Sequence, residues 1–509
     1  MSDVLIIGGG PNGLLLAGEL ALAGVRATVL ERFAERPTMP KANGLVGRVV
    51  QAMDHRGLYE RLSGSTTPPV PMPGFQFGAL PLDLSTMEHS LYALPVPQRR
   101  LEELLEDRAR ELGVDLRRGH ELRAVHQDDD RVTAEIDGPD GPYELAAKYL
   151  VGADGGRSVV RKQCGIGFPG ITDDGFVSRT GQVEIAAPVA VGTGELDVPG
   201  LGRLRPATFT RTDTGMFAYG MFQPGRYRVS VFEWGAEPAT EHDDIPLAEL
   251  RDAVNRVLGT DLPMSETMTG ATTGALRRTV GVNSRQADRY RHGRVFLAGD
   301  AAHVHSGVGG PGLNLGMQDV LNLGWKLAAA VGGWAPPGLL DTYESERQPV
   351  GLRVIMHTRA QLALLQPGPN VTALRELMTE LLHDRATARH LADLMAGADI
   401  RYATTDPHPM AGRWVPDLTL HDGRRIAELL RPARPILLNL AGRKDIADAA
   451  AGWADRVYVV TARADTPVAA VLVRPDSYVA WATDDSADGL RDALETWFGQ
   501  AGPRLSRTR

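Results

Sequence analysis

Short apolar runs separated by glycines and polar residues open the chain and predict a parallel β-sheet with helices. Residues 4–7 are all apolar, which is typical of a strand buried on both faces. Residues 14–23 have helical spacing, and the segment VRATVLE then predicts a second strand that ends at Glu31. Residues 150–153 and 295–298 predict two further buried strands. The pattern therefore predicts an α/β fold with a Rossmann-type domain.

The middle and the end of the chain follow other patterns. Apolar and polar residues alternate between the turn signals TDTG and QPGR, which predicts antiparallel strands. Residues 340–389 show helical periodicity that Pro349 interrupts, so two helices or a kink are expected. The segments PILLNLAG, DRVYVVTA and AAVLVRPDSYVAWAT then predict strands, and GLRDALETWFGQ predicts a closing helix.

These patterns divide the 509 residues into three expected domains. Residues 1–170 and 275–395 form the Rossmann-type domain with its associated helices. Residues 171–274 form an inserted, mainly antiparallel β-sheet domain for substrate, which also receives part of residues 70–97. Residues 400–509 form the C-terminal domain.

Composition narrows the function classes. Apolar residues make up 43% and charged residues 23% of the chain, which is ordinary for a globular enzyme. A formal net charge of −8 argues against a nucleic-acid partner. Cys164 is the single cysteine, so an intrachain disulfide and a thiol redox pair are excluded. No signal peptide or membrane span is predicted, and we expect a cytoplasmic protein.

A glycine motif follows the first strand. Gly8, Gly10 and Gly13 form GxGxxG, with Asn12 inside the motif and Glu31 at the end of the second strand. The first glycine permits a tight turn, the second lets the backbone approach a pyrophosphate, and the third lets helix and strand pack closely. The helix N-terminus favours phosphate, and the acid accepts hydrogen bonds from a ribose. The motif predicts a dinucleotide site without distinguishing NAD from FAD.

Two later strand ends also carry acids. Asp154 precedes Gly155 after the strand at residues 150–153. Asp300 follows Gly299, and a glycine-rich loop then leads into a predicted helix near Leu313. Acids at strand ends, beside the amides of a helix start, can serve ribityl hydroxyls and a flavin ring.

In this order, the three stretches resemble the GxGxxG, DG and GD fingerprints of the group A flavoprotein aromatic hydroxylases, the para-hydroxybenzoate hydroxylase-like superfamily. The similarity is nearest to the bacterial polyketide-hydroxylase and rifampicin-monooxygenase branch. It implies a bound FAD, NADPH or NADH as a transient reductant, and oxygen that forms a flavin hydroperoxide. We therefore expect a monooxygenase that hydroxylates a bulky phenolic or aromatic polyketide substrate.

The resemblance also implies cofactor contacts. Arg48 would contact the flavin side, Gln98 the ribityl chain, and Arg32 and the backbone around Leu122 the adenosine. The expected cofactor residues are Gly8, Gly10, Asn12, Gly13, Glu31, Arg32, Arg48, Gln98, Leu122, Asp154, Asp300, Gly310, Pro311, Gly312, Leu313 and Asn314. No catalytic acid or base is named with confidence, because the flavin is the reagent.

In the family, the antiparallel sheet forms the roof of the substrate pocket. The expected substrate contacts are Phe217, Tyr219, Phe232, Arg205 and Ser306, although half of an alternating set must face elsewhere. His303 and His305, with Asp300 nearby, could imitate a metal pair. No third ligand is identifiable, so no metal is expected.

The loop after His303 departs from the family pattern. Relatives often have two prolines and then GGQG, whereas this chain has Val304-His305-Ser306-Gly307-Val308 and then GGPG. The glycines that remain favour FAD binding, but substrate placement is affected. Three alternatives stay open: a redox-silent FAD-containing [4+2] cyclase, a Baeyer–Villiger oxygenase, and a protein that sequesters an antibiotic.

The C-terminal domain resembles the thioredoxin-like domain of the same branch. It contains no cysteine, so it cannot perform thiol redox chemistry. A structural or dimerisation role is expected, which is consistent with a homodimer.

Overall fold

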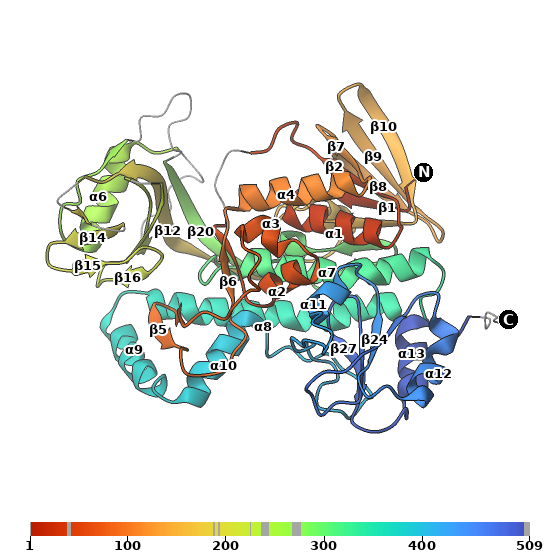
Figure 1. The fold of residues 1–509 in the computed structure, drawn as a ribbon. Coiled ribbons are helices and arrows are strands. Elements are labelled where there is room, and N and C mark those ends of the chain that lie inside the picture. The colour runs from red at the N-terminus through yellow and green to blue at the C-terminus, as the bar shows by residue number, and fades with distance from the viewer. Residues whose placement is uncertain are drawn as a thin grey trace.

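The computed structural model describes residues 2–37, 42–186, 189–191, 194–223, 225–235, 244–266 and 276–502. Figure 1 shows a central α/β body, an antiparallel sheet at the left and a C-terminal body at the lower right. The long helices α7 (Pro311–Val331) and α8 (Thr342–Leu365) run through the middle. The expected boundary between residues 274 and 275 lies outside the described residues, and the domain limits stay a prediction.

A six-stranded sheet forms the centre of the α/β body, in the order β21-β22-β11-β1-β2-β7. All of its pairings are parallel except that of β21 with β22. All four residues of β1 are buried, as expected for a strand covered on both faces. The strands are β1 (Val4–Ile7), β2 (Ala27–Glu31), β7 (Asp115–Arg118), β11 (Tyr149–Gly152), β21 (Arg291–His292) and β22 (Val295–Leu297). The strands predicted at residues 4–7, 150–153 and 295–298 are thus confirmed.

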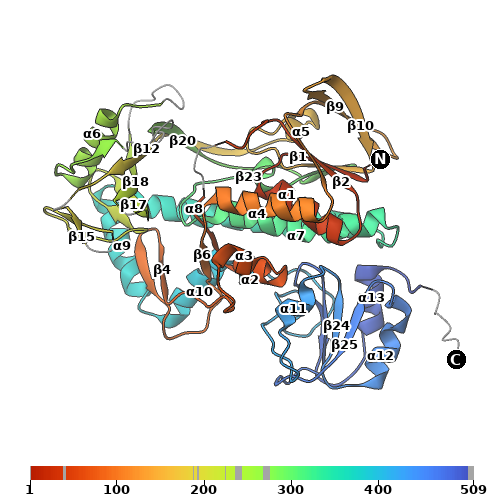
Figure 2. The same cartoon turned by 45° about the horizontal axis from the view of Figure 1, so that its top comes forward.

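Helices cover this sheet, and their apolar sides complete its core. Helix α1 (Pro11–Leu22) packs against α4 (Gln98–Glu111) and α7, as Figure 2 shows. The remaining small elements of this body are α2 (Arg48–His55), α3 (Tyr59–Ser63), α5 (Val159–Gln163), β3 (Gly44–Val46), β6 (Ala93–Pro95), β8 (Glu121–Gln127), β9 (Val132–Gly138), β10 (Gly141–Ala147), η1 (Gly299–Ala301) and η2 (Leu339–Asp341).

The second body is a seven-stranded sheet in the order β16-β17-β18-β12-β20-β23, with β19 also paired to β12. All of its pairings are antiparallel, which confirms the predicted antiparallel region. Helix α6 (Leu247–Leu258) packs on one face and forms a core with it. Its strands are β12 (Gly170–Glu184), β16 (Phe209–Arg211), β17 (Met216–Gln223), β18 (Arg226–Trp234), β19 (Ser265–Glu266), β20 (Arg277–Gln286) and β23 (His303–Val304), and a small sheet of β13 (Ala190–Val191), β14 (Glu195–Val198) and β15 (Gly202–Leu204) lies in the same body.

The segment at residues 70–97 forms the hairpin β4 (Gly74–Phe77) and β5 (Leu80–Asp83). Its apolar side chains form a core with α8 and α10 (Arg385–Ala396), next to α9 (Pro369–Leu381). It touches the antiparallel sheet through Gln76, whose Nε2 donates to the Ala207 carbonyl at 3.2 Å.

Helix α8 continues from Thr342 to Leu365 with Pro349 inside it, so a break into two helices at Pro349 is wrong, and the alternative of a kink stays a prediction. Proline removes one backbone donor, and side chains on either side anchor this turn. Arg347 is fully buried in an ion pair with Asp319, and Gln348 donates to the Asp288 carbonyl at 2.9 Å. These contacts hold the helix together where its own ladder is weakened.

The C-terminal body is a four-stranded sheet in the order β25-β24-β26-β27 with helices around it. Its elements are α11 (Ile426–Leu430), β24 (Ile436–Asn439), α12 (Lys444–Ala450), η3 (Ala451–Trp453), β25 (Tyr458–Thr461), β26 (Ala470–Val473), β27 (Val479–Thr483) and α13 (Leu490–Phe498). The strands and the closing helix predicted from this stretch are confirmed. Cys164 lies far earlier in the chain, and burial raises its pKa to about 11.

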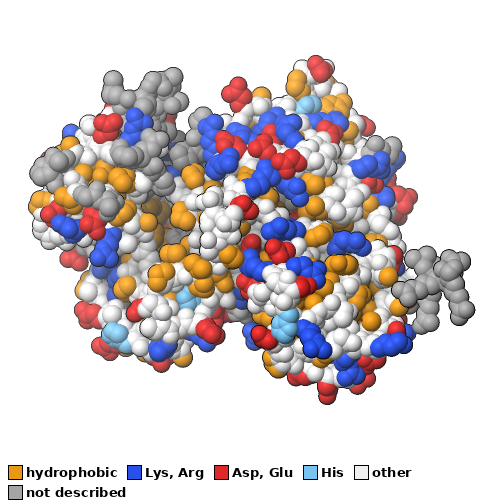
Figure 3. Space-filling view, viewed as in Figure 1, with side chains coloured by type: hydrophobic (Ala, Val, Ile, Leu, Met, Phe, Trp, Pro, Cys, Tyr) orange, Lys and Arg blue, Asp and Glu red, His pale blue; other side chains and the backbone are white. Residues whose placement is uncertain are grey.

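The surface carries charges of both signs. Figure 3 shows Lys and Arg side chains interspersed with Asp and Glu on the face of Figure 1. Along the described parts of the chain, no helix combines the length and the apolar character needed to cross a bilayer.

Candidate functional site

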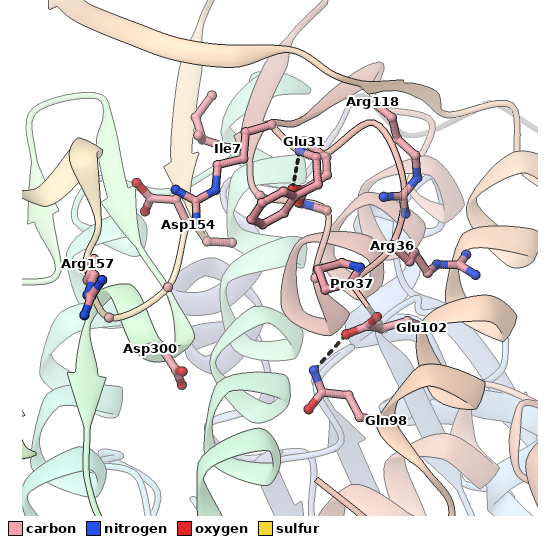
Figure 4. A pocket seen from close by; sticks show the side chains of 18 of the residues that line it. Ile7, Glu31, Arg36, Pro37, Gln98, Glu102, Arg118, Asp154, Arg157 and Asp300 are labelled. Atoms are coloured by element: carbon pink, nitrogen blue, oxygen red, sulfur yellow. Dashed lines mark hydrogen bonds between the residues drawn. The ribbon is translucent and has the colours of Figure 1, made fainter. Parts of the chain in front are cut away.

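A cleft of about 550 Å³ opens at the carboxyl ends of β1, β2 and β11. Carboxyl ends of neighbouring parallel strands are where open α/β sheets bind ligands. The expected cofactor residues that line it are Gly8, Gly10, Glu31, Arg32, Gln98, Leu122, Asp154 and Asp300. Figure 4 shows Glu31, Gln98, Asp154 and Asp300 around this space, which they reach from four separate segments.

The three motif glycines have three different environments. Gly8 has φ +113°, and a Cβ there would overlap the carbonyl oxygen of Ala153 on the next strand. A Cβ on Gly13 would overlap the carbonyl oxygen of Gly8, because α1 starts directly above β1. A Cβ on Gly10 would meet no atom within 4 Å. The turn and the packing therefore need Gly8 and Gly13, while Gly10 leaves open space at the start of α1.

Asn12 does not line the cleft, and its side chain connects two motifs instead. A Cβ on Gly299 or on Gly316 would overlap Asn12 Nδ2. This amide therefore lies between α7 and the turn at Gly299-Asp300, which we call the GD turn. Its Oδ1 is buried without a hydrogen-bond partner. The close approach of Asn12 therefore requires glycine at positions 299 and 316.

Backbone amides hold the carboxylate of Glu31 at one end of the cleft. Gly9 N donates to Oε2 at 2.8 Å, and Phe33 N donates to Oε1 at 2.9 Å. The Arg32 guanidinium lies over the Phe33 ring at 4.6 Å. Carboxylate oxygens have further lone pairs, so Glu31 can still accept hydrogen bonds from a ribose.

Asp154 organises the second motif. Its Oδ2 accepts from Val159 N at 2.7 Å and from Val160 N at 3.1 Å, which begins α5. Its Oδ1 is buried and has no partner. A buried acceptor without a partner is costly, and a donor from a bound ligand would satisfy it.

Arg161 connects the second and third motifs, a role that we did not assign from the sequence. Its Nη1 donates to Ala301 O at 2.8 Å and its Nη2 to Gly156 O at 2.9 Å. Its guanidinium also lies 3.7 Å from the centre of the Phe168 ring. The spacing DGxxxxxR carries the signal, because it places an arginine on the first turn of a helix whose first amides donate to Asp154.

Gln98 and Asp300 complete the cleft. Gln98 Nε2 donates to Glu102 Oε1 at 2.7 Å, and its Oε1 accepts from Ala42 N at 3.3 Å. Asp300 is exposed in η1 and lines the cleft from the side of the GD turn.

Arg48 and residues 310–314 lie together outside the lining of this cleft. Asn314 Oδ1 accepts from Val46 N at 2.9 Å, and Asn314 Nδ2 donates to Gly310 O at 2.6 Å. The loop at residues 306–312, which we call the glycine loop, is thereby connected to β3, just before Arg48. Burial lowers the pKa of Arg48, and its Nε has no hydrogen-bond partner. Its contact with a flavin remains a prediction.

The expected substrate residues separate into two groups. Phe217 and Tyr219 lie in the core with α6, and the Tyr219 hydroxyl donates to Leu204 O at 2.8 Å. Arg205 is 80% exposed and lies 3.8 Å from Glu195. These three positions are corrected: alternation along β17 turns Phe217 and Tyr219 to the α6 face, and Arg205 points to solvent. Phe232 lies on the other side with Val308 of the glycine loop, and Ser306 is buried in that loop.

The other face of the antiparallel sheet meets α8 and the glycine loop in an apolar group that we call the sheet–loop cluster. Its buried members are Phe176, Met216, Val308, Leu362 and Leu365, with Ala79, Phe209, Phe232, Trp234 and Val282 packed against them. Trp234 Nε1 is buried there without a partner. An unpaired donor in an apolar setting is costly unless a ligand supplies an acceptor.

Two neutral imidazoles lie beside this cluster. Burial lowers the pKa of His305 and of His357 to about 4 each. His305 Nδ1 lies 2.9 Å from Ser306 O, so it carries the proton, and Nε2 is an acceptor. Across the residues that the structure describes, no three His, Cys, Asp or Glu side chains converge as metal ligands.

The family profiles for an "FAD binding domain" and for "Aromatic-ring hydroxylase, C-terminal" match residues 1–358 and 408–501, respectively. The chain belongs to the FAD-dependent aromatic-ring hydroxylases. This hydroxylase is 45% identical to a 12-dehydrotetracycline 5-monooxygenase/anhydrotetracycline 6-monooxygenase of Streptomyces rimosus, over 98% of this chain and 99% of the relative. It is 41% identical to a rifampicin monooxygenase of Streptomyces venezuelae, with the same coverage. The family inferred from the three motifs is confirmed.

Solved structures agree with this assignment. The anhydrotetracycline hydroxylase of Streptomyces rimosus superposes with a TM-score of 0.86 at 43% identity, over 98% of this chain and all of that one. A dialkyldecalin synthase of Streptomyces rugosporus is less similar, at 37% identity over 98% of this chain. The hydroxylase is therefore an FAD-dependent monooxygenase that uses a nicotinamide reductant.

The residues present fit FAD. Gly10 leaves room where a pyrophosphate would approach the start of α1, and Glu31 offers acceptors at the ribose end. The unpartnered Oδ1 of Asp154 can accept a hydrogen bond from a ligand in the cleft. Arg36 and Arg118 line the Glu31 end as well, and both pair with Glu106.

Proposed function

We propose that this hydroxylase acts on a bulky aromatic polyketide and holds it against the sheet–loop cluster. The printed names of the relatives support this substrate class, since they include anhydrotetracycline and rifampicin monooxygenases. The single observation that carries the proposal is the aromatic and apolar composition of the sheet–loop cluster, which joins the sheet, α8 and the glycine loop. Such a surface suits fused aromatic rings.

FAD, when bound, supplies the oxygen chemistry at the expense of NADPH or NADH. In this proposal Glu31, Asp154 and Gln98 bind and orient the cofactor along the cleft. Phe232 and Trp234 contact the substrate and exclude water from it, and the buried Met216 packs with them in the cluster. Ser306 keeps the loop in shape, because its Oγ accepts from Val308 N at 3.3 Å.

Polar anchors within the apolar setting would set the orientation of the substrate. Trp234 Nε1 can donate to a carbonyl or phenolic oxygen, and His305 Nε2 can accept from a hydroxyl. Both imidazoles near the cluster stay neutral at physiological pH, because burial lowers their pKa to about 4. A substrate that carries both a hydroxyl group and a carbonyl or phenolic oxygen suits this donor and acceptor.

The direct test is turnover of anhydrotetracycline and of rifampicin by the FAD-loaded protein with NADPH and oxygen. We expect a product sixteen mass units heavier, with NADPH consumed in proportion. Trp234→Phe keeps the ring but removes the donor, and it should raise KM roughly fivefold to tenfold. Uncoupled peroxide alone, across these and related aromatics, would contradict the proposal.

The altered loop at residues 306–312 favours one second candidate, a redox-silent cyclase. The similarity to the dialkyldecalin synthase supports it more weakly than the monooxygenase matches support hydroxylation. Turnover without NADPH would favour this candidate. A Baeyer–Villiger product has the same mass gain but loses a ketone carbon signal, and stoichiometric capture without turnover would indicate sequestration.

We further propose that the hydroxylase works in the cytoplasm as a homodimer. The absence of cysteine from the C-terminal domain supports a structural or dimerisation role there. Light scattering after size-exclusion chromatography tests the assembly, because a monomer mass would contradict it.

A further inference from the structure

A chain of buried charges connects the C-terminal domain to the GD turn beside the cleft. The structure assigns Asp319 and Arg347 as positioning residues, through which the C-terminal domain acts on the flavin site. This inference goes beyond the proposed function, because it concerns how the cofactor site is held and gives the cysteine-free domain a task.

The chain begins in the turn between β26 and β27. Arg474 donates to Glu346 Oε1 at 2.6 Å and to Oε2 at 2.8 Å, and its Nε donates to Asp476 Oδ1 at 3.0 Å. Glu346 also receives Lys326 Nζ at 2.6 Å. Arg474 is 1% exposed and Lys326 is 0% exposed. The C-terminal domain is thus anchored to both α7 and α8 where water is excluded.

A second contact leads from the same turn to Arg347. The rings of Tyr478 and Tyr402 lie 4.1 Å apart, and the Tyr402 hydroxyl accepts from Arg347 Nη1 at 3.1 Å. Tyr402 belongs to the segment that enters the C-terminal domain, and its N–H donates to Gly412 O at 2.8 Å. Tyr402 therefore joins this turn to the Arg347 guanidinium by direct contacts.

Asp319 connects Arg347 to the GD turn. Arg347 Nε donates to Asp319 Oδ1 at 2.8 Å. Asp319 Oδ2 lies 2.6 Å from His303 Nε2 and accepts from Gly299 N at 3.3 Å. Gly299 is the residue before Asp300, which lines the cleft. One carboxylate therefore holds both ends of the segment from Gly299 to His303.

Because Asp319 is buried, its carboxylate depends on its protein partners. Burial by itself would raise the pKa of Asp319, but His303 and Arg347 keep it below its ordinary value. Asp319 and Arg347 are both 0% exposed, so no water can replace a lost partner without rearrangement. The GD turn should therefore move when either residue loses its geometry.

The test compares FAD dissociation constants and flavin midpoint potentials of the full-length holoenzyme. Asp319→Asn should weaken FAD binding by about tenfold to hundredfold, because one donor loses its acceptor. Tyr402→Phe removes only the hydroxyl that receives Arg347, and it should weaken FAD binding by roughly threefold to tenfold. Both variants should shift the midpoint potential, which a general loss of stability would not do.

A double-mutant cycle decides whether the effect travels along this chain. If Tyr402 acts through Asp319, Tyr402→Phe should have little further effect in the Asp319→Asn background. Tyr458→Phe is the matched control, since Tyr458 is 49% exposed in the same domain. It should leave both measurements unchanged.

If Asp319→Asn fails to fold, Arg347→Lys together with Tyr402→Phe provides the same cycle. Unchanged FAD affinity and potential in Tyr402→Phe, with only a lower melting temperature, would overturn the inference. Additive effects of the paired substitutions would overturn it as well.

Discussion

The dinucleotide cleft and the sheet–loop cluster are built differently. The cleft depends on backbone geometry: glycines at turns and carboxylates that accept backbone amides. The sheet–loop cluster depends on side chains from five strands of the antiparallel sheet, from α8 and from a loop. The first kind of site appears as a local motif, whereas the second requires the register of every strand that contributes.

Strand β17 shows the difference most clearly. Met216 and Phe217 are neighbours in sequence and are both fully buried, but they belong to different cores. Successive side chains of a strand point to opposite faces, so one residue of register decides which of them can meet a substrate. A backbone-defined cleft has no such ambiguity.

The largest effect is expected from glycine substitutions in the cleft. Gly13→Ala should lower stability by more than about 3 kcal/mol and leave little folded holoenzyme, because the new methyl overlaps Gly8 O. Gly10→Ala should fold normally and bind FAD about tenfold more weakly, because it fills the approach to the phosphates. Thermal melts and FAD titrations measure both.

Gly307→Ala serves as the control for these two variants, since a Cβ there meets nothing within 4 Å. If all three variants had the same melting temperature and the same FAD affinity, the different roles assigned to Gly13 in packing and to Gly10 in phosphate approach would be wrong.

A smaller effect should separate the two faces of β17. Met216→Ala and Phe217→Ala both create cavities and should lower the melting temperature. Only Met216→Ala should also weaken substrate binding, by roughly tenfold, because Met216 packs with Phe232 and Trp234 on the cluster face. Flavin absorbance changes during substrate titration report this binding. A similar loss of binding in Phe217→Ala would show that the faces are wrongly assigned.

The smallest effect concerns pH. The pKa of His357 is about 4 in the folded protein because of burial, and it is near 6.5 when unfolded. The stability that the neutral ring contributes is present above pH 6.5 and is lost as the pH falls toward 4. Between pH 7.5 and pH 5.0, the melting temperature of His357→Gln should therefore fall by a few °C less than that of the wild type. This difference corresponds to about 2 kcal/mol of unfolding free energy.

His390→Gln is the matched control for the pH series, because His390 is exposed on α10. It should follow the wild-type curve. A His357→Gln curve that also follows the wild type would mean that burial does not keep this ring neutral.

The sequence by itself determined the α/β framework, the three motifs and the family, because strands buried on both faces and glycine turns leave local patterns. It also identified Glu31, Asp154 and Asp300 as acids at the ends of neighbouring strands. Only the tertiary structure decided that Phe217 and Tyr219 face α6, and that Arg161 and Asp319 hold the motifs together. Those outcomes depend on strand register and on contacts between segments far apart in the chain, and no local pattern encodes them.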